Sequence, residues 1–463
     1  MGNRRHAIEL LNAGIASVTD KSNPQHLTHA YQCMASACLV DPTYVDALYQ
    51  VGNVTSDLNL LHASIACWRR ALQSDPTDEQ RVNILTNLSW RCLTTGRVDE
   101  ALDYGLQAVA LDPKMAYAWV NLAQVYQIFD NSAEAAACAR KAFELKPDDA
   151  LIEFGLGLAL MFNREIEDGL RHMESRFRYR LRNYLQYPYP KWDGSNDRTI
   201  FLVADQGLGD TLSFARFVPE LCKRAKYVHA AIQPELMRLF VTAFAGIPNF
   251  NPFPSGQMLP PADCWTTFVS LPSSLGLDAD TFRNTPQIPL PRCEIPVNWK
   301  VPDRKLHIGI AWAGSPANDI NMHRSIPFEP FFELAAVPGV QLYSLQVGQN
   351  AKDMHDAGAS ALCMDLTSYI REITDTLAIL DHLDLVISCE SALVHICSAA
   401  NKEVWVPYSW LGRDYRIGST GEDAIWHPKL RVFRQGSDRN WTPVFKQIAK
   451  ALEERIDELD QKA

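Results

Sequence analysis

The residues of this chain with the clearest chemical potential form a short segment of aspartate and glycine. Residues 205–210 have the sequence Asp-Gln-Gly-Leu-Gly-Asp. Gly207 and Gly209 permit backbone conformations and close approaches that a Cβ atom would block. Asp210 follows them, and a carboxylate at this point suits a base that removes a proton from an acceptor hydroxyl group. The alternative is an aspartate that only caps a helix, and the segment alone favours neither interpretation.

A second polar group follows an apolar run at residues 383–388. A helix is expected to begin directly after this run, and the start of a helix presents backbone N–H groups that can cradle a diphosphate. Those N–H groups belong to Ser391, Ala392 and Leu393. Glu390 could accept hydrogen bonds from sugar or ribose hydroxyl groups, or it could only stabilise the start of the helix. His395, one turn further, is more typical of a structural histidine than of a catalyst.

A third group follows the apolar run at residues 306–312, where Ala313-Gly314-Ser315 is expected to form a turn. Arg324, further along, is the natural charge partner of a leaving phosphate. Other polar residues that would face the same cleft are Asn318, Asp319 and Ser325.

The elements that must position these groups follow from the spacing of apolar residues. Short apolar runs predict strands at residues 201–204, 228–232 and 264–269, with a helix over residues 211–224 between the first two. Residues 286–302, with five prolines, are expected to form a linker. Further strands are predicted at residues 306–312, 340–345, 383–388 and 404–407. Two α/β lobes with a cleft between their strand ends have the shape of GT-B glycosyltransferases.

The first 180 residues have a different organisation, because they repeat. An Asp-Pro or Lys-Pro pair ends at Pro42, Pro76, Pro113 and Pro147, at intervals of 34, 37 and 34 residues. This is the period of tetratricopeptide helical hairpins. Such hairpins stack into a surface that holds a peptide, a partner protein or the neighbouring domain. The alternative is a scaffold that packs only on its own catalytic domain.

A basic and aromatic segment joins the two parts of the chain. Residues 176–184 alternate arginine with aromatic residues and lead into the sequence Tyr-Pro-Tyr-Pro-Lys-Trp-Asp-Gly at residues 187–194. Arginine and aromatic side chains together could bind a nucleic-acid backbone and stack on bases. The more frequent role of such a segment is a junction, in which arginines are solvated or paired with acids.

Composition narrows the class of protein. The chain has 463 residues, a formal net charge of −10, 47% hydrophobic and 21% charged residues, as expected for a soluble globular protein with two or three domains. The negative charge argues mildly against a general nucleic-acid binder. The 11 cysteines show no metal-ligand spacing and are expected to be reduced thiols of a cytoplasmic protein. We expect neither a membrane-spanning segment nor a signal peptide.

Taken together, the motifs resemble those of bacterial and phage tetratricopeptide proteins whose C-terminal lobe pair is similar to heptosyltransferases. The segments that carry the resemblance are residues 190–194, 205–210, 310–315, 324–327, 344–346 and 387–395. The expected fold is an N-terminal tetratricopeptide helical solenoid followed by a two-lobed, double Rossmann-like GT-B glycosyltransferase. The expected boundaries are residues 1–180 for the repeats, 181–197 for the junction, 198–295 for the N-terminal lobe and 296–463 for the C-terminal lobe.

The resemblance implies an inverting transfer from a nucleotide-diphosphate sugar, without a metal ion or a further cofactor. By this resemblance Asp210 is the base. The implied donor-binding residues are Gly207, Gly209, Trp312, Gly314, Ser315, Arg324, Gln346, Glu390, Ser391, Ala392, Leu393 and His395. Two residues depart from the pattern, because Glu390 replaces an aspartate and Asp205 replaces a glutamate. The extra methylene of Glu390 changes which donor hydroxyl it reaches, so the donor need not be heptose.

The sequence leaves the acceptor open. A repeat array beside a glycosyltransferase makes a polypeptide acceptor plausible, and a saccharide is its rival. A third acceptor is a hydroxylated base in phage DNA. An alternative outside catalysis is a tetratricopeptide scaffold that binds a partner protein and turns nothing over.

Overall fold

A computed structural model describes most of the chain. The described residues are 2–18, 23–179, 187–288, 290–291, 294–315, 321–412, 414–418, 423–424 and 427–462. The chain folds into two compact units, Met1–Glu165 and Ile166–Ala463. The domain boundaries expected at residues 180, 197 and 295 stay predictions.

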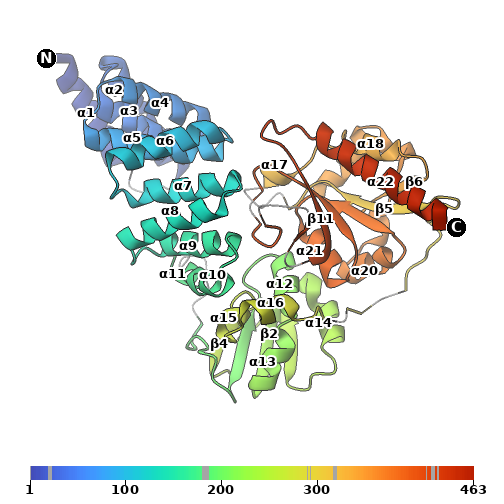
Figure 1. Cartoon of the computed structure of the whole chain (residues 1–463). Coiled ribbons are helices and arrows are strands. Elements are labelled where there is room, and N and C mark those ends of the chain that lie inside the picture. Colours follow the sequence, from blue (N-terminus) through green and yellow to red (C-terminus); the bar gives the residue numbers. More distant parts are fainter. Residues whose placement is uncertain are drawn as a thin grey trace. The chain divides into compact units, whose positions relative to one another are not determined.

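The first unit is an array of antiparallel helical pairs that stack along the chain (Figure 1). Its helices are α1 Gly2–Ser17, α2 Pro24–Val40, α3 Val45–Asp57, α4 Leu61–Gln73, α5 Asp78–Thr94, α6 Val98–Leu111, α7 Ala116–Ile128, α8 Ser132–Leu145 and α9 Ala150–Phe162. The four repeated prolines lie two or three residues after the ends of α2, α4, α6 and α8, because proline cannot continue a helix. The predicted tetratricopeptide architecture is therefore confirmed.

Small residues allow the helices of neighbouring pairs to approach. Ala101, Ala108 and Ala135 have no exposed surface. A Cβ atom added at Gly105 would lie 2.7 Å from Cδ2 of Leu122 on the next hairpin. Close packing of this kind stabilises the array, since each hairpin alone cannot bury its apolar face.

The second unit begins with α10 Ile166–Met173 and α11 Arg176–Tyr179 and then forms a parallel sheet. The strands are β1 Thr199–Val203, β2 Tyr227–Ile232, β3 Phe250–Pro254 and β4 Cys264–Thr267, in the spatial order β3-β2-β1-β4. The helices that follow these strands are α12 Leu208–Ala215, α13 Val218–Arg224, η1 Pro234–Leu236, α14 Met237–Ala243, α15 Leu271–Ser274 and α16 Ala279–Asn284.

A second, larger sheet completes the unit, with the order β10-β11-β9-β8-β5-β6-β7. Its strands are β5 Leu306–Ala311, β6 Val340–Ser344, β7 Cys363–Asp365, β8 Leu385–Ser388, β9 Val404–Tyr408, β10 Asp423–Ala424 and β11 His427–Arg434. All pairings are parallel except that of β10 with β11. The helices are α17 Asn321–Arg324, α18 Phe331–Ala335, η2 Gln349–Ala351, α19 Lys352–Asp356, η3 Ala359–Ala361, η4 Thr367–Tyr369, α20 Ile373–Asp381, α21 Ala392–Ala399 and α22 Thr442–Lys462.

The structure confirms two Rossmann-like α/β lobes but differs from the sequence prediction in detail. The helix expected over residues 211–224 is two helices, α12 and α13. Pro219 explains the break, because it lies in the first turn of α13 and lacks the N–H that a continuous helix needs. The strands β3, β7, β10 and β11 had no counterpart in the prediction, since their sequences are short or rich in polar residues and proline.

An apolar core of the larger lobe packs residues of its sheet against α18, α19 and α22. Trp312 and Phe331 pack there with Phe445 and Ile448 of α22. Among the described residues, no helix is long and apolar enough to cross a membrane. The ten cysteines that the structure describes are free thiols.

Candidate functional site

Each sheet of the second unit has one position where the strand order reverses. In the smaller sheet this lies between β1 and β4, and in the larger sheet between β5 and β8. Open α/β sheets bind ligands outside the carboxyl ends of strands at such a reversal. We call the carboxyl ends of β1 and β4 the first switch position, and those of β5 and β8 the second switch position.

The second switch position brings together two of the three polar groups singled out in the sequence. The turn at Gly314 and Ser315 follows β5, and Glu390 and Ser391 follow β8. The two strand ends are joined by a hydrogen bond from the Cys389 N–H to the Ala311 carbonyl, at 3.0 Å. Asn318 and Asp319 lie outside the described residues.

The absence of a side chain at Gly314 leaves room for the Arg324 guanidinium beside Glu390. A Cβ atom at position 314 would lie 2.6 Å from Nη2 of Arg324, so the guanidinium packs directly on the glycine backbone. The Arg324 Nη1 atom is 3.8 Å from Oε1 of Glu390, and both side chains are largely buried. An ion pair so enclosed can present one cationic edge to a phosphate.

Two other predicted donor-binding residues brace this turn. Oε1 of Gln346 accepts hydrogen bonds from the N–H groups of Trp312, at 3.0 Å, and Ala313, at 2.8 Å. The Trp312 indole is buried in the core and donates from Nε1 to Oδ2 of Asp353 at 3.2 Å. Both side chains therefore position the turn, and their assignment to donor contacts stays a prediction.

Ser391 begins α21, as expected from the sequence. Its Oγ accepts the Leu393 N–H at 3.3 Å and shares a hydrogen bond with Oγ of Ser388 at 3.1 Å. Ser391 has an extended backbone and is the N-cap of α21, and the first N–H groups of a helix have no partner within the helix. With Ala392 next in the chain, this is the helix start expected to hold a diphosphate.

Asp210 is both a helix-capping residue and an ion-pair partner. The N-cap of α12 is Gly207, and Oδ2 of Asp210, three residues later, accepts its N–H at 3.2 Å, so Asp210 contributes to the cap without being the N-cap residue expected as an alternative. Its Oδ1 accepts a hydrogen bond from Nη1 of Arg416 in the larger lobe, at 2.7 Å. The Asp210 side chain is 29% exposed, so it remains within reach of a substrate.

Arg416 is the functional candidate that the sequence analysis missed. Besides Asp210 it binds Asp414, from Nε to Oδ1 at 2.8 Å and from Nη2 to Oδ2 at 2.7 Å. The only available signal was a charged cluster at residues 412–416, shortly after the strand predicted at 404–407. The spacing of these residues does not predict a contact between Arg416 and Asp210.

The two lobes meet through α12 and α21, where a histidine packs on a glycine. A Cβ atom at Gly209 would lie 2.4 Å from Cδ2 of His395. The His395 ring contacts Oγ of Ser213 through Nδ1 at 3.2 Å, and its Nε2 lies 3.8 Å from Oδ2 of Asp414. The ring is buried, so His395 packs at the contact between the lobes, and its assignment to donor contacts stays a prediction.

The ionisation of Glu390 is strongly affected by its surroundings. Burial raises the pKa of Glu390 from its ordinary value of 4.5 to about 7, and the negative charge of Asp414 adds to this. Arg324 and Arg416 oppose the rise. The pKa of Asp414 itself is low despite its burial, because Arg416 binds it directly. The carboxylates of Asp210, Glu390 and Asp414 thus compete for two guanidinium groups, and protonation of Glu390 balances the charges.

The site combines a helix start, two arginines and one accessible carboxylate. Its members, which we call the interlobe cluster, are Asp210, Arg324, Glu390, Asp414 and Arg416. Among the described residues no group of three or more histidine, cysteine, aspartate or glutamate side chains is arranged to hold a metal ion. The cluster can bind an anionic group at the arginines and accept a proton at Asp210.

Comparisons with known proteins bear mainly on the repeats. A family model described as a tetratricopeptide repeat matches residues 116–149. Protein FlbA of Caulobacter vibrioides is 22% identical over 444 residues, which span 81% of this chain and 73% of FlbA. Similar solved structures include PilF of Pseudomonas aeruginosa, at 18% identity and a TM-score of 0.33, covering 40% of this chain and 80% of that one. YrrB, a TPR protein with an unusual peptide-binding site, has 18% identity and a TM-score of 0.31, with coverages of 38% and 88%. The chain thus contains a tetratricopeptide repeat and is distantly related to FlbA.

Proposed function

We propose that the second unit is a GT-B glycosyltransferase that moves a sugar from a nucleotide-diphosphate donor to an acceptor hydroxyl group. The observation that carries the proposal is the ion pair between Asp210 of the smaller lobe and Arg416 of the larger lobe, beside Glu390 and the start of α21. A proton acceptor and an anion-binding group on opposite lobes are what a displacement at a sugar carbon requires. In this proposal residues 198–295 form the acceptor lobe and residues 296–463 the donor lobe.

The proposed reaction is a single displacement. The acceptor hydroxyl group lies beside Asp210, which takes its proton as the oxygen attacks the anomeric carbon from the face opposite the nucleotide. The bond between that carbon and the diphosphate oxygen breaks, and the configuration inverts. Arg324, Arg416 and the first N–H groups of α21 stabilise the charge of the departing diphosphate. These groups serve as the counter-charge, so the proposal needs no metal ion.

Arg416 connects donor binding to the activation of Asp210. Its guanidinium is shared between Asp210 and Asp414. Because Arg416 is buried, exchanging its contact with Asp210 for a contact with water alone would be costly. A diphosphate competes with Asp210 for the same N–H groups, since phosphate oxygens are strong bidentate acceptors of arginine. Donor binding would then release Asp210 to accept the proton of the acceptor.

The test of this proposal is a thermal-shift screen of the full chain against UDP-, GDP-, ADP-, CMP- and dTDP-sugars. A ligand at 100 times its Kd raises the free energy of unfolding by about 2.7 kcal/mol. We expect one nucleotide class to raise the melting temperature and its labelled sugar to be transferred to an acceptor. Binding without hydrolysis or transfer would instead support the scaffold alternative, and no binding to the folded protein would contradict the proposal.

The ionisation of Glu390 predicts a distinctive pH dependence. As the pH rises through about 7, Glu390 gains a negative charge beside the arginines, so nucleoside diphosphates should bind more weakly at about pH 8 than at about pH 6. Glu390→Gln should remove most of this difference. Calorimetric titration of both proteins with the nucleotide found in the screen measures it. The ionisation of the ligand affects both proteins equally, so an identical pH dependence in the variant would contradict the assignment.

The same pKa shift has a consequence for folding. Because the pKa of Glu390 is above its ordinary value of 4.5 in the folded protein, its ionisation destabilises the fold as the pH rises from about 4.5 to about 7. Glu390→Gln should therefore stabilise the protein by about 1–3 kcal/mol at pH 8 and have little effect at pH 5. Thermal unfolding at the two pH values checks the sign.

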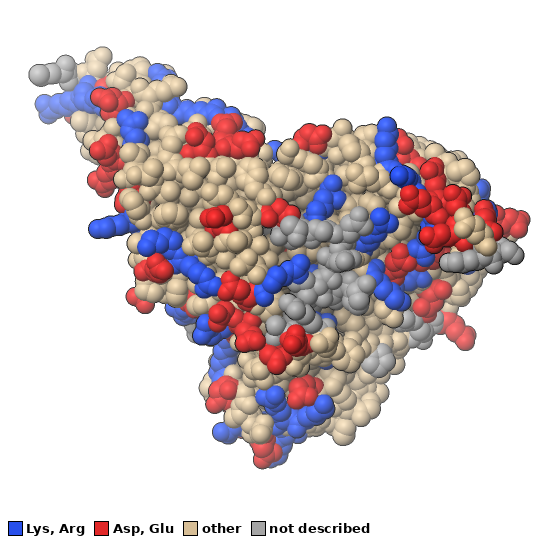
Figure 2. All heavy atoms as spheres, viewed as in Figure 1, with Lys and Arg blue, Asp and Glu red and all other residues tan. Residues whose placement is uncertain are grey.

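For the acceptor, the repeats favour a polypeptide. A tetratricopeptide array is a surface suited to proteins. The DNA alternative loses one of its supports, because Arg176 of the basic segment is buried against the carboxylates of Glu174 and Asp205. Figure 2 shows acidic and basic side chains interspersed over the described residues of one face. Transfer assays with peptide, glycan and hydroxylated DNA acceptors decide between these classes.

A further inference from the structure

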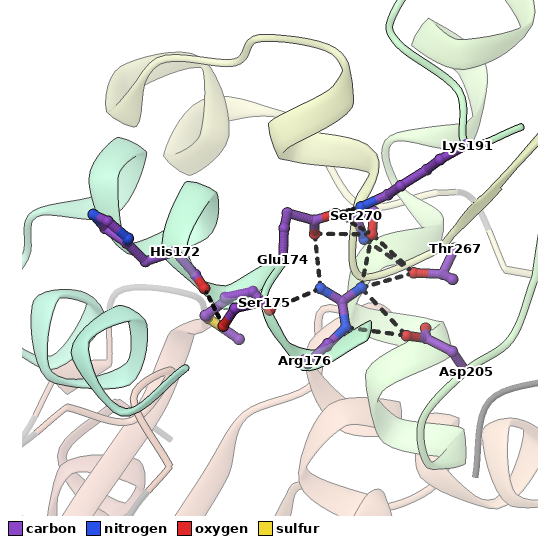
Figure 3. Close-up of polar contacts among 9 residues, drawn as sticks. His172, Glu174, Ser175, Arg176, Lys191, Asp205, Thr267 and Ser270 are labelled. Carbon is purple, nitrogen blue, oxygen red and sulfur yellow. Dashed lines mark hydrogen bonds and ion pairs between the residues drawn. The ribbon is translucent and has the colours of Figure 1, made fainter. Parts of the chain in front are cut away.

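The first switch position is occupied by a side chain of the protein itself. Arg176, from α11, lies at the carboxyl ends of β1 and β4 with its guanidinium between Asp205 and Ser270 (Figure 3). The side chain is only 2% exposed. In an open α/β sheet this is where a ligand would bind, so Arg176 takes the place of a ligand in the smaller lobe.

All three guanidinium nitrogens donate hydrogen bonds. Nε and Nη2 both reach Oδ2 of Asp205 at 3.3 Å, and Nη2 also reaches Oγ1 of Thr267 at 2.9 Å and Oγ of Ser270 at 2.7 Å. Nη1 donates to the Met173 carbonyl at 3.2 Å and to Oε1 of Glu174 at 2.7 Å. One side chain thus ties α11 to the segments that follow β1 and β4.

The charges around Arg176 balance within the lobe. Arg176 and Lys191 face Glu174 and Asp205, and Lys191 also binds Glu174 directly. This pairing of an arginine with acids is what a junction would contain, and the junction itself stays a prediction. Phe177 adds apolar contact, because its ring packs edge-on against Trp265 of β4 with a centroid distance of 5.4 Å.

The buried carboxylate of Asp205 has Arg176 as its main stabilising partner. It is buried, and its Oδ1 has no hydrogen-bond partner among the described residues. Burial raises the pKa of Asp205, and Arg176 is the main group that opposes the rise. Asp205 also begins the turn that leads through Gly207 and Gly209 to Asp210, so its position sets the course of that turn.

Other contacts hold the later part of the turn, where Asp210 accepts hydrogen bonds from the Gly207 N–H and from Arg416. Gln233 Nε2 donates to the Gln206 carbonyl and to Oγ1 of Thr211, both at 2.9 Å. The two glycines at 207 and 209 add conformational freedom rather than restraint. Without Arg176 the turn loses two hydrogen bonds to Oδ2 of Asp205, and the buried carboxylate loses its cationic partner.

We propose that Arg176 is a positioning residue that fills the first switch position and holds the Asp205–Asp210 turn so that Asp210 faces Arg416. This rests on the proposed function only for the role of Asp210 as the base. The smaller lobe then holds no nucleotide of its own, and its switch position serves to fix the acceptor-side carboxylate. A displacement of about 1 Å at a reacting group can lower a rate by about 100-fold, so the expected effect of losing Arg176 falls on turnover.

The experiment compares the full chain with three variants. The double variant Arg176→Met/Asp205→Asn removes both charges of the buried pair and leaves the Glu174–Lys191 pair. It should fold, because deleting both partners of a buried ion pair is much less costly than deleting one. Arg176→Lys keeps the charge without the planar fork. Arg178→Met is the matched control, since it removes an exposed arginine from the same helix.

Two measurements distinguish positioning from a purely structural role. Amide hydrogen exchange over residues 204–212 should be faster in the double variant and in Arg176→Lys, and unchanged in Arg178→Met, whether or not any sugar is transferred. Where transfer is measurable, kcat should fall about 10- to 100-fold while the affinity of the donor nucleotide stays unchanged. Unaltered exchange in a folded double variant would overturn the proposal, as would normal kcat. Faster exchange in a protein that transfers no sugar would leave Arg176 as the anchor of the turn and refute only the proposed function.

Discussion

Asp210→Asn is expected to lower kcat by about 10²- to 10⁴-fold, the usual contribution of a general base. Asparagine keeps the shape of the side chain and can still accept the Gly207 N–H at the start of α12. It cannot accept a proton from the attacking hydroxyl group. Nucleotide affinity should stay the same or rise, because Arg416 loses one of the two carboxylates that compete with a diphosphate.

The control for this variant is Asp278→Asn. Asp278 also stands at the start of a helix, where it accepts the Thr281 N–H at 2.7 Å, but it is exposed and is no part of the interlobe cluster. The comparison separates the capping role of an aspartate from its role as a base. Steady-state kinetics with the donor found in the screen measures the effect. If Asp210→Asn turned over at the rate of the control, Asp210 would be a helix cap and the base would lie elsewhere.

Arg416→Met should have the largest combined effect on stability and binding. It removes the guanidinium contacts that the described residues show for Asp414, a carboxylate whose side chain is only 5% exposed. Breaking one partner of a buried ion pair typically costs about 3–5 kcal/mol. The same variant removes one of the two cations proposed to bind the diphosphate, so nucleotide binding should be lost. Arg416→Lys should recover part of the stability but little of the affinity, because an ammonium cannot bind two acceptors in the planar, bidentate manner of a guanidinium.

A matched control is available in the same lobe. Arg455 also binds a carboxylate through two hydrogen bonds, to Oε1 and Oε2 of Glu403 at 2.8 Å each, but its side chain is 30% exposed. Arg455→Met should therefore cost no more than about 1 kcal/mol and leave nucleotide binding intact. Denaturant unfolding and nucleotide titration of both variants test the difference. Equal losses of stability would mean that the burial of the Arg416 pair has no energetic significance.

The sequence by itself was sufficient for the architecture. The proline period of the first 180 residues and the apolar runs of the remainder predicted the repeats and the two α/β lobes, because hairpins, strands and their turns depend on residues close together in the chain. For the same reason it located the turn at Gly207 and Gly209 and the helix start at Ser391. It did not locate the break before Pro219 from the apolar spacing alone, since that spacing continues across both helices.

Only the tertiary structure decided which of these groups meet and which charges they share. Asp210 and Arg416 are 206 residues apart, and Arg176 and Ser270 are 94 residues apart. No local periodicity records such a pair, because its geometry depends on how two sheets and their helices pack. The role of His395 was favoured from the sequence, but its partner Gly209 was not, since a close approach is visible only when both backbones are in place. Candidate residues at the carboxyl end of each strand can thus be predicted from the sequence of that strand and its turn. The ion pairs that change the charge and position of these residues form only when the two lobes fold together.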